Sequence, residues 1–171
     1  MKHIKLLLLL ASLSCLSLHC KKESEEDKLP PATASGKQTF GCKVNGKNWI
    51  GDEFYSKAEY WQGRIGIDGV QGDGFDPDAV ITIGVVGYSI TKPGYYEFNY
   101  DDPAIRCYVF SKINKISYEL DYCLGGKAAL NITRFDTIQG YISGQFNFVA
   151  CNKEKTSYII VTEGRFDFKY K

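Results

Sequence analysis

Short apolar and aromatic runs, each closed by Gly, Pro, Asn or Asp, fill the chain after residue 38 and restrict its fold more than any other feature. Such runs are typical of β-strands bounded by turns. Asn45-Gly46 lies between two of them and is a strong short-range signal for a hairpin. The sequence therefore predicts an all-β fold, a single antiparallel β-sandwich or barrel-like domain over residues 38–171. The clearest runs are AVITIGVVGYSI, KAALNITRF and GYISGQFNFVA.

One pattern occurs twice, as SGQFNF at 143–148 and EGRFDF at 163–168. Because side chains alternate between the two faces of a strand, the phenylalanines of each copy share one face and the polar residues share the other. We expect the phenylalanines to lie in the core, and the glycines to allow a bulge or a close approach. They are Phe146, Phe148, Phe166 and Phe168.

The first residues have the order of a secretory signal peptide. A basic start is followed by an apolar stretch, Leu6 to Leu18, that is shorter than the ~20 residues a membrane-spanning helix needs. The transition from apolar to charged residues at Cys20 resembles the lipobox of bacterial signal-peptidase II substrates, whose cysteine is acylated, for example with palmitate. Cys20 is favoured, Cys15 is the alternative, and an ordinary secreted protein remains a further possibility. We predict a signal peptide over 1–19 and a flexible, lipid-anchored tether over 20–37.

Composition excludes several kinds of chemistry. Both histidines, His3 and His19, lie in the signal, so the mature chain has no histidine for a catalytic triad or a zinc site. Removing Lys2 and Lys5 from the 21 basic residues leaves 19 against 20 acidic ones, a net charge of about −1 that argues against nucleic-acid binding. No cofactor is expected.

Four cysteines remain after the signal in a chain expected to leave the cytoplasm, and none forms a Cys-x-x-Cys motif. If Ile132 faces Ile142 in a hairpin, the extended ladder also places Cys123 opposite Cys151. We therefore predict the disulfides Cys123–Cys151 and Cys42–Cys107, with free thiols as the alternative.

Three segments of the chain resemble an uncharacterised family of Bacteroidetes lipoproteins. They are the entry LPPATASGKQTFGCKVNGKNW and the closing segments ITRFDTIQGYISGQFNF and TEGRFDFKY. Residues 52–125 match no motif of that family. The resemblance implies a lipid anchor on the outer membrane and a β-rich domain. The acidic stretch after Cys20 resembles the tag that exports such lipoproteins to the cell surface, although a solvated linker explains it equally well.

Ligand sites are suggested by three weaker patterns. The pairs Tyr60-Trp61 and Tyr95-Tyr96 should each expose one aromatic ring, onto which a sugar could stack, although core packing explains most aromatics. DGVQGDGFDPD at 68–78 is a weak calcium candidate that a turn-rich loop explains as well; its aspartates are Asp68, Asp73, Asp76 and Asp78.

Asp136-Thr137-Ile138 resembles the O-glycosylation motif of Bacteroidetes, and its place between two predicted strands makes Thr137 accessible. The carboxylate pairs Glu53 with Glu59 and Asp101 with Asp102 have no spacing that indicates hydrolysis. We expect a cell-envelope binding or structural module, displayed on the surface rather than facing the periplasm, with a glycan or envelope protein as partner. The alternative is a carbohydrate-binding or carbohydrate-active surface protein that uses exposed aromatics and carboxylates.

Overall fold

The computed structural model describes residues 28–86 and 90–170, and these form an open, antiparallel all-β domain, as predicted. The candidate lipidation sites, Cys15 and Cys20, lie outside the described residues. Within the described residues, no helix is long and apolar enough to cross a membrane. The strands are β1 (Thr39–Val44), β2 (Lys47–Ile50), β3 (Lys57–Trp61), β4 (Arg64–Asp73), β5 (Asp76–Val85), β6 (Gly94–Asn99), β7 (Ile105–Ser111), β8 (Ile116–Glu119), β9 (Lys127–Asp136), β10 (Tyr141–Asn152) and β11 (Tyr158–Lys169), with a 3-10 helix, η3 (Leu120–Tyr122), after β8.

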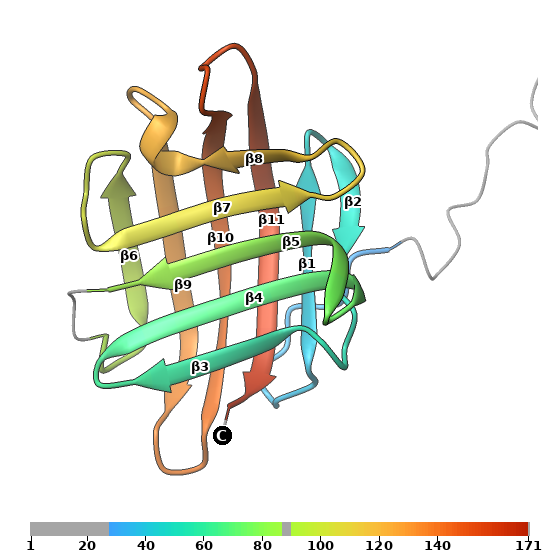
Figure 1. The fold of residues 1–171 in the computed structure, drawn as a ribbon. Coiled ribbons are helices and arrows are strands. Elements are labelled where there is room, and N and C mark those ends of the chain that lie inside the picture. Colours follow the sequence, from blue (N-terminus) through green and yellow to red (C-terminus); the bar gives the residue numbers. More distant parts are fainter. Residues whose placement is uncertain (1–27, 87–89, 171) are drawn as a thin grey trace, which may run out of the picture.

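The strands form two layers that cross each other (Figure 1). The larger layer has the order β2-β1-β11-β10-β9-β6, and the smaller has β8-β7-β5-β4-β3. The far end of β10 also pairs with β8, through Cys151 opposite Glu119, so one continuous sheet folds over onto itself. The described strands do not close this sheet into a barrel.

Aromatic rings fill the space between the layers. All four phenylalanines of the repeated pattern are buried, which confirms the prediction made for them. The ring of Phe146 lies 5.1 Å from that of Phe40 and 6.4 Å from that of Phe166, measured between centroids. Burying side chains of this size contributes about 1.5–3 kcal/mol each, so this cluster from β1, β10 and β11 is a main part of the core. The ring of Phe40 also lies against Gly69 on β4 of the smaller layer.

Two local predictions about hairpins have different outcomes. The Asn45-Gly46 turn connects β1 to β2, and both residues have positive φ, as a two-residue hairpin turn requires. The stretch 68–78, read as a turn-rich loop or calcium candidate, instead belongs mostly to β4 and β5. Cross-strand pairing runs from Asp68 opposite Thr82 up to Asp73 opposite Asp76. Glycines at 69, 72 and 74 interrupt the alternating pattern and obscured that strand in the sequence.

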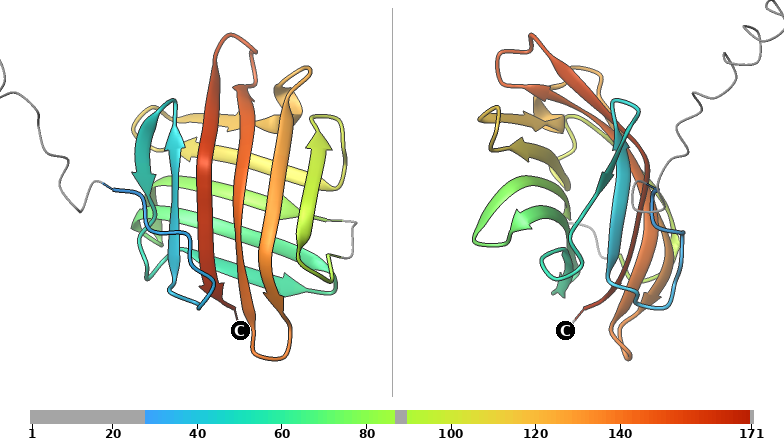
Figure 2. Two further views of the ribbon diagram at one scale, coloured as in Figure 1. Left: turned by 180° about the vertical axis from the view of Figure 1, so that it is seen from behind. Right: turned by 90° about the vertical axis from the view of Figure 1, so that its right-hand side faces the viewer.

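Residues 30–37 correct the prediction of a flexible tether. They lie across β1 and β11 on the outer face of the larger layer (Figure 2) and are held there by hydrogen bonds. Gly41 permits this contact, because a Cβ at Gly41 would lie 2.5 Å from Cδ of Pro30. The ordered part of the chain therefore begins before the first strand.

The predicted Cys123–Cys151 disulfide is present, but the register from which it was inferred is wrong. Ile132 pairs with Gly144 rather than with Ile142, and Cys123 follows η3 rather than extending β9. The predicted Cys42–Cys107 disulfide is absent, since both are buried free thiols. They lie on β1 and β7 in opposite layers, and packed sheets are about 10 Å apart, farther than a disulfide reaches between Cα atoms.

Candidate functional site: a polar row on the outer face

A row of polar side chains crosses the outer face of the larger layer. Tyr95 on β6 pairs with Asn131 on β9, Asn131 with Gln145 on β10, and Gln145 with Arg165 on β11. Directly paired residues of neighbouring strands place their side chains on the same face, about 4.5–5.5 Å apart. The row therefore presents one phenol, two amides and one guanidinium along a single line.

The row borders a pocket of about 330 Å³. Small residues, Ala129 and Gly164, lie among the longer side chains and leave room for it. A Cβ at Gly164 would lie 2.5 Å from the ring of Phe146, so glycine allows the core ring to approach the backbone there. The polar residues that line the pocket are Tyr95, Asn131, Gln145, Asn147, Glu163 and Arg165.

A β-bulge in β11 gives the pocket its charged end. Phe146 pairs with Gly164 and Phe148 with Val161, so Thr162 and Glu163 together face a single residue of β10. Glu163 has a φ of 51°, which is unusual for a residue other than glycine inside a strand. The pairing of β11 with β10 on one side and β1 on the other therefore sets this backbone conformation, rather than the φ that glutamate ordinarily adopts.

Glu163 is held by two cations. Its Oε1 accepts a hydrogen bond from Nζ of Lys43 at 2.7 Å, and Nη2 of Arg165 lies 3.8 Å from its Oε2. The hydrogen bond from Lys43 is the main cause that lowers the pKa of Glu163 below its usual value. The carboxylate consequently stays ionised near neutral pH and orients Arg165 along the row.

A hollow of about 860 Å³ adjoins the pocket on the side of β1 and β2 and shares Glu163 and Arg165 with it. Its remaining charged lining consists of lysines: Lys28, Lys43 and Lys47. The outer face therefore becomes more positive toward β2, on a chain whose net charge is only +1.

The predicted aromatic residues do not form one site. Tyr95 and Trp61 are 65% and 63% exposed, while Tyr60 and Tyr96 turn inward, which agrees with the expected alternation. Tyr60 packs its ring 5.0 Å from that of Phe135, and Trp61 lies on β3 in the smaller layer. Only Tyr95 of these four lines the pocket.

The aspartates of the calcium candidate are also dispersed. The carboxylate of Asp68 accepts a hydrogen bond from Thr82, and Asp76 pairs with Lys112 near the β4–β5 turn. Among the described residues, no three His, Cys, Asp or Glu side chains gather as a metal site would require.

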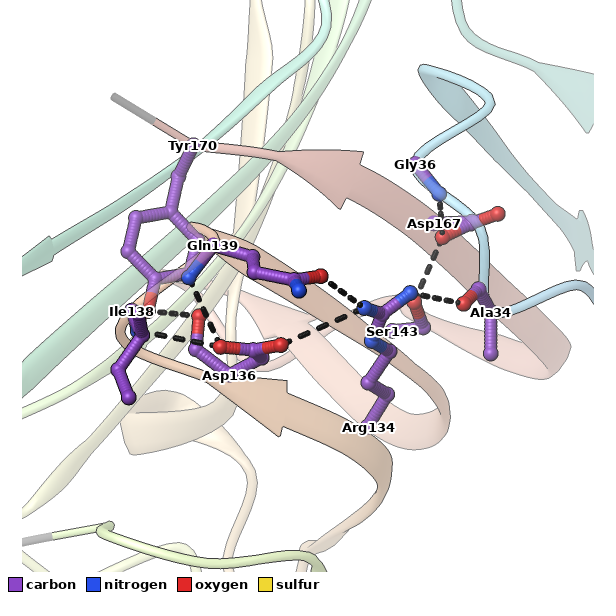
Figure 3. Close-up of polar contacts among 9 residues, drawn as sticks. All are labelled: Ala34, Gly36, Arg134, Asp136, Ile138, Gln139, Ser143, Asp167 and Tyr170. Carbon is purple, nitrogen blue, oxygen red and sulfur yellow. Dashed lines mark hydrogen bonds and ion pairs between the residues drawn. The ribbon is translucent and has the colours of Figure 1, made fainter.

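Thr137 is exposed at the tip of the β9–β10 hairpin, the position predicted for it. The turn is fixed by Asp136, whose Oδ1 accepts hydrogen bonds from the backbone N–H groups of Ile138 and Gln139 at 3.1 and 2.8 Å (Figure 3). The bond from Gln139 is the main cause that lowers the pKa of Asp136. Arg134 completes the turn through Oδ2 of Asp136 and the side-chain oxygen of Gln139.

Asp167 fastens the N-terminal segment to the same outer face (Figure 3). Its carboxylate accepts hydrogen bonds from Oγ of Ser143 at 2.6 Å and from the backbone N–H of Gly36 at 2.8 Å. Thr33 Oγ1 and the N–H groups of Ser35 and Lys37 donate three more. No sequence pattern indicates this clamp, because most of the groups that donate to Asp167 are backbone N–H groups 130 or more positions away.

Comparison with known proteins assigns the chain to no group: no protein-family model, no curated protein and no solved structure matches it.

Proposed function

We propose that this protein is an exported, lipid-anchored binding module of the cell envelope. The signal-like first 19 residues, Cys20 at the border of a charged stretch, and the resemblance to Bacteroidetes lipoproteins support export and anchoring. The Cys123–Cys151 disulfide fits an oxidising compartment, although it does not specify which one. Display on the surface of the outer membrane is the location that this proposal favours.

The ligand class best suited to the outer-face pocket is carbohydrate. The observation that carries this proposal is the exposed ring of Tyr95 beside the amide of Asn131, with the amide of Gln145 one strand further along the row. The apolar face of a sugar ring packs on an aromatic ring, while side-chain amides donate and accept the hydrogen bonds that hydroxyl groups need. A volume of about 330 Å³ suits one or two sugar units of a longer chain.

Binding fits the pocket better than hydrolysis does. Cleavage of a glycosidic bond uses a pair of carboxyl groups on either side of the scissile bond. The described lining of the pocket contains one carboxylate, Glu163, and it is already paired with Lys43. The pocket therefore favours a binding module over a glycoside hydrolase.

Substitution of Tyr95 tests the site. We expect Tyr95→Ala to weaken binding of a polysaccharide identified by calorimetry by about two- to tenfold, because an aromatic contact contributes roughly 0.5–1.5 kcal/mol. Tyr158→Ala is the matched control, since Tyr158 is 63% exposed on β11 and does not line the pocket. Equal effects of the two substitutions, or no binding across neutral and acidic polysaccharides, would refute the carbohydrate site.

The anchor needs a separate test. Cells that express the protein should incorporate labelled palmitate into it, and Cys20→Ala should abolish this labelling while Cys15→Ala preserves it. Surface display predicts that protease added to intact cells removes the domain while a periplasmic control protein survives. An unlabelled wild-type protein would refute the lipid anchor without affecting the carbohydrate site.

A further inference from the structure

Three loop tips at one edge of the domain carry large apolar side chains that are almost fully exposed. Phe54 in the β2–β3 loop is 84% exposed, Phe75 in the β4–β5 turn is 97% exposed, and Ile113 in the β7–β8 turn is 84% exposed. Single exposed apolar residues are ordinary on protein surfaces, whereas several on one surface indicate that something covers them. Their common position is therefore the feature to explain.

The three tips contact each other in series. The ring of Tyr55, next to Phe54, covers Gly74, where a Cβ would lie 2.4 Å from Cδ1 of the tyrosine. On the other side, Lys112 forms an ion pair with Asp76, so the β7–β8 turn lies against the β4–β5 turn. The ribbon shows the three connections along the same side of the domain, at the right of Figure 1.

The N-terminal segment leaves the domain at this edge. Lys28 and Leu29 line the hollow next to Ile50 at the end of β2 and Gln71 near the end of β4. Figure 2 shows the described part of the segment beginning beside β2 and crossing β1 and β11. Cys20 lies eight positions before Lys28 in the sequence, and eight residues span at most roughly 29 Å. An anchor at Cys20 thus keeps this edge close to the bilayer.

We propose that this edge, formed by Phe54, Phe75 and Ile113, rests on the phospholipid surface to which the chain is anchored. The inference depends on the proposed anchoring and adds an orientation to it. Exposed phenylalanine and isoleucine side chains enter the boundary between headgroups and acyl chains. Lys112 and Lys115 in the β7–β8 turn share this edge with the carboxylates of the other two tips, so apolar insertion rather than charge attraction carries the contact. These carboxylates are Asp52, Glu53, Asp73 and Asp76.

Two other exposed apolar side chains provide matched controls. Leu124, 80% exposed, follows η3, and Ile138, 96% exposed, lies at the tip of the β9–β10 hairpin. Each of them belongs to a turn outside the three-tip edge (Figure 1). A general tendency of loop tips to touch a membrane would act on these residues as well.

The test uses the mature chain from Cys20, coupled through that thiol to a maleimide lipid in phosphatidylcholine–phosphatidylglycerol vesicles. Chemical coupling removes any dependence on acylation in the cell, and Cys42 and Cys107 are buried and do not compete. Variants Phe75→Trp and Ile138→Trp are compared in vesicles with and without brominated acyl chains. The emission of the wild-type tryptophans, Trp49 and Trp61, is subtracted as background.

We expect brominated lipid to quench most of the emission added by Phe75→Trp and little of that added by Ile138→Trp. Equal quenching of both, or none at Phe75→Trp, would overturn the proposed orientation. The uncoupled chain should sediment as a monomer. A dimer that Phe75→Ser dissociates would instead assign the edge to a second copy. Failure of palmitate labelling in cells would contradict the natural anchor while leaving this surface property measurable.

Discussion

Replacing Asp167 with asparagine removes the charge from the clamp that holds residues 33–37 on β11. Burial alone raises the pKa of this carboxyl, but the hydrogen bonds from Ser143, Thr33, Ser35 and Gly36 outweigh burial and bring the pKa from 3.8 to about 2. One pKa unit corresponds to about 1.4 kcal/mol, so the ionised carboxylate contributes about 2 kcal/mol to the free energy of unfolding. Asparagine keeps the shape but lacks this charge.

The direction of the pKa shift determines how the contribution of Asp167 to the free energy of unfolding changes with pH. Because the folded-state pKa is depressed, the contribution of Asp167 is fully present above its unfolded pKa of about 3.8 and is lost as the pH falls toward 2. Urea unfolding followed by tryptophan emission should therefore show Asp167→Asn about 2 kcal/mol less stable than wild type at pH 7, with a difference that vanishes near pH 2.

The exposed Asp101 provides the control, since Asp101→Asn should leave stability almost unchanged at either pH. Loss of the clamp should also expose the segment around Lys37, so trypsin should cut Asp167→Asn there faster than wild type. A stability difference between wild type and Asp167→Asn that stays constant from pH 7 to pH 2 would refute the assignment of this energy to the ionised carboxylate.

Three further predictions concern the core and the sheet. Replacing Cys123 and Cys151 by serine should lower the free energy of unfolding by about 3.5 kcal/mol, as measured by urea unfolding. This value is the loop-closure entropy expected for a separation of 28 residues. Burial raises the pKa of Cys42 to about 12 and that of Cys107 further, so iodoacetamide at pH 8 should label neither in the folded protein and both after denaturation, as read by mass spectrometry. Gly164→Ala should lower the free energy of unfolding by about 1–3 kcal/mol, because its Cβ would meet the Phe146 ring at 2.5 Å. Gly66→Ala on β4 is the control: its Cβ has nothing within 4 Å, so the free energy of unfolding should change by less than about 1 kcal/mol.

Alternation along the strands explains why the core could be predicted from the sequence. In SGQFNF and EGRFDF the phenylalanines face the interior, and residues that alternate with them, Gln145, Asn147 and Arg165, reach the outer face. The alternation that identifies the core residues therefore also identifies Gln145 and Arg165, two of the four residues of the polar row. Alternation along one strand does not show which strands lie beside it. Tyr95 and Asn131 could therefore not be assigned to the row before the strand pairing was known.

The predicted register between β9 and β10 was wrong for a physical reason. A bulge between Ser143 and Gly144 shifts the β9–β10 pairing by one residue, and Ile132 lies opposite Gly144, two positions from the assumed Ile142. The alternation of side chains along the two strands does not reveal this shift. The ladder also does not extend to Cys123, because β9 begins at Lys127. The correct cysteine pair resulted because η3 brings Cys123 back beside the end of β10, an arrangement that no strand ladder predicts.

The clamp and the edge together determine which way the candidate site faces. Residues 33–37 are fixed on β11, and Lys28, the first described residue, lies in the hollow beside β2. In the larger layer, β2 and β6 are the two edge strands, separated by five strand spacings of about 4.8 Å, or roughly 24 Å. If the β2 edge rests on the membrane as proposed, Tyr95 on β6 is held at the side of the layer farthest from the lipid. A polysaccharide outside the cell would then reach the aromatic end of the row first, and the positive end near Lys43 and Arg165 would favour sugars that carry a carboxylate.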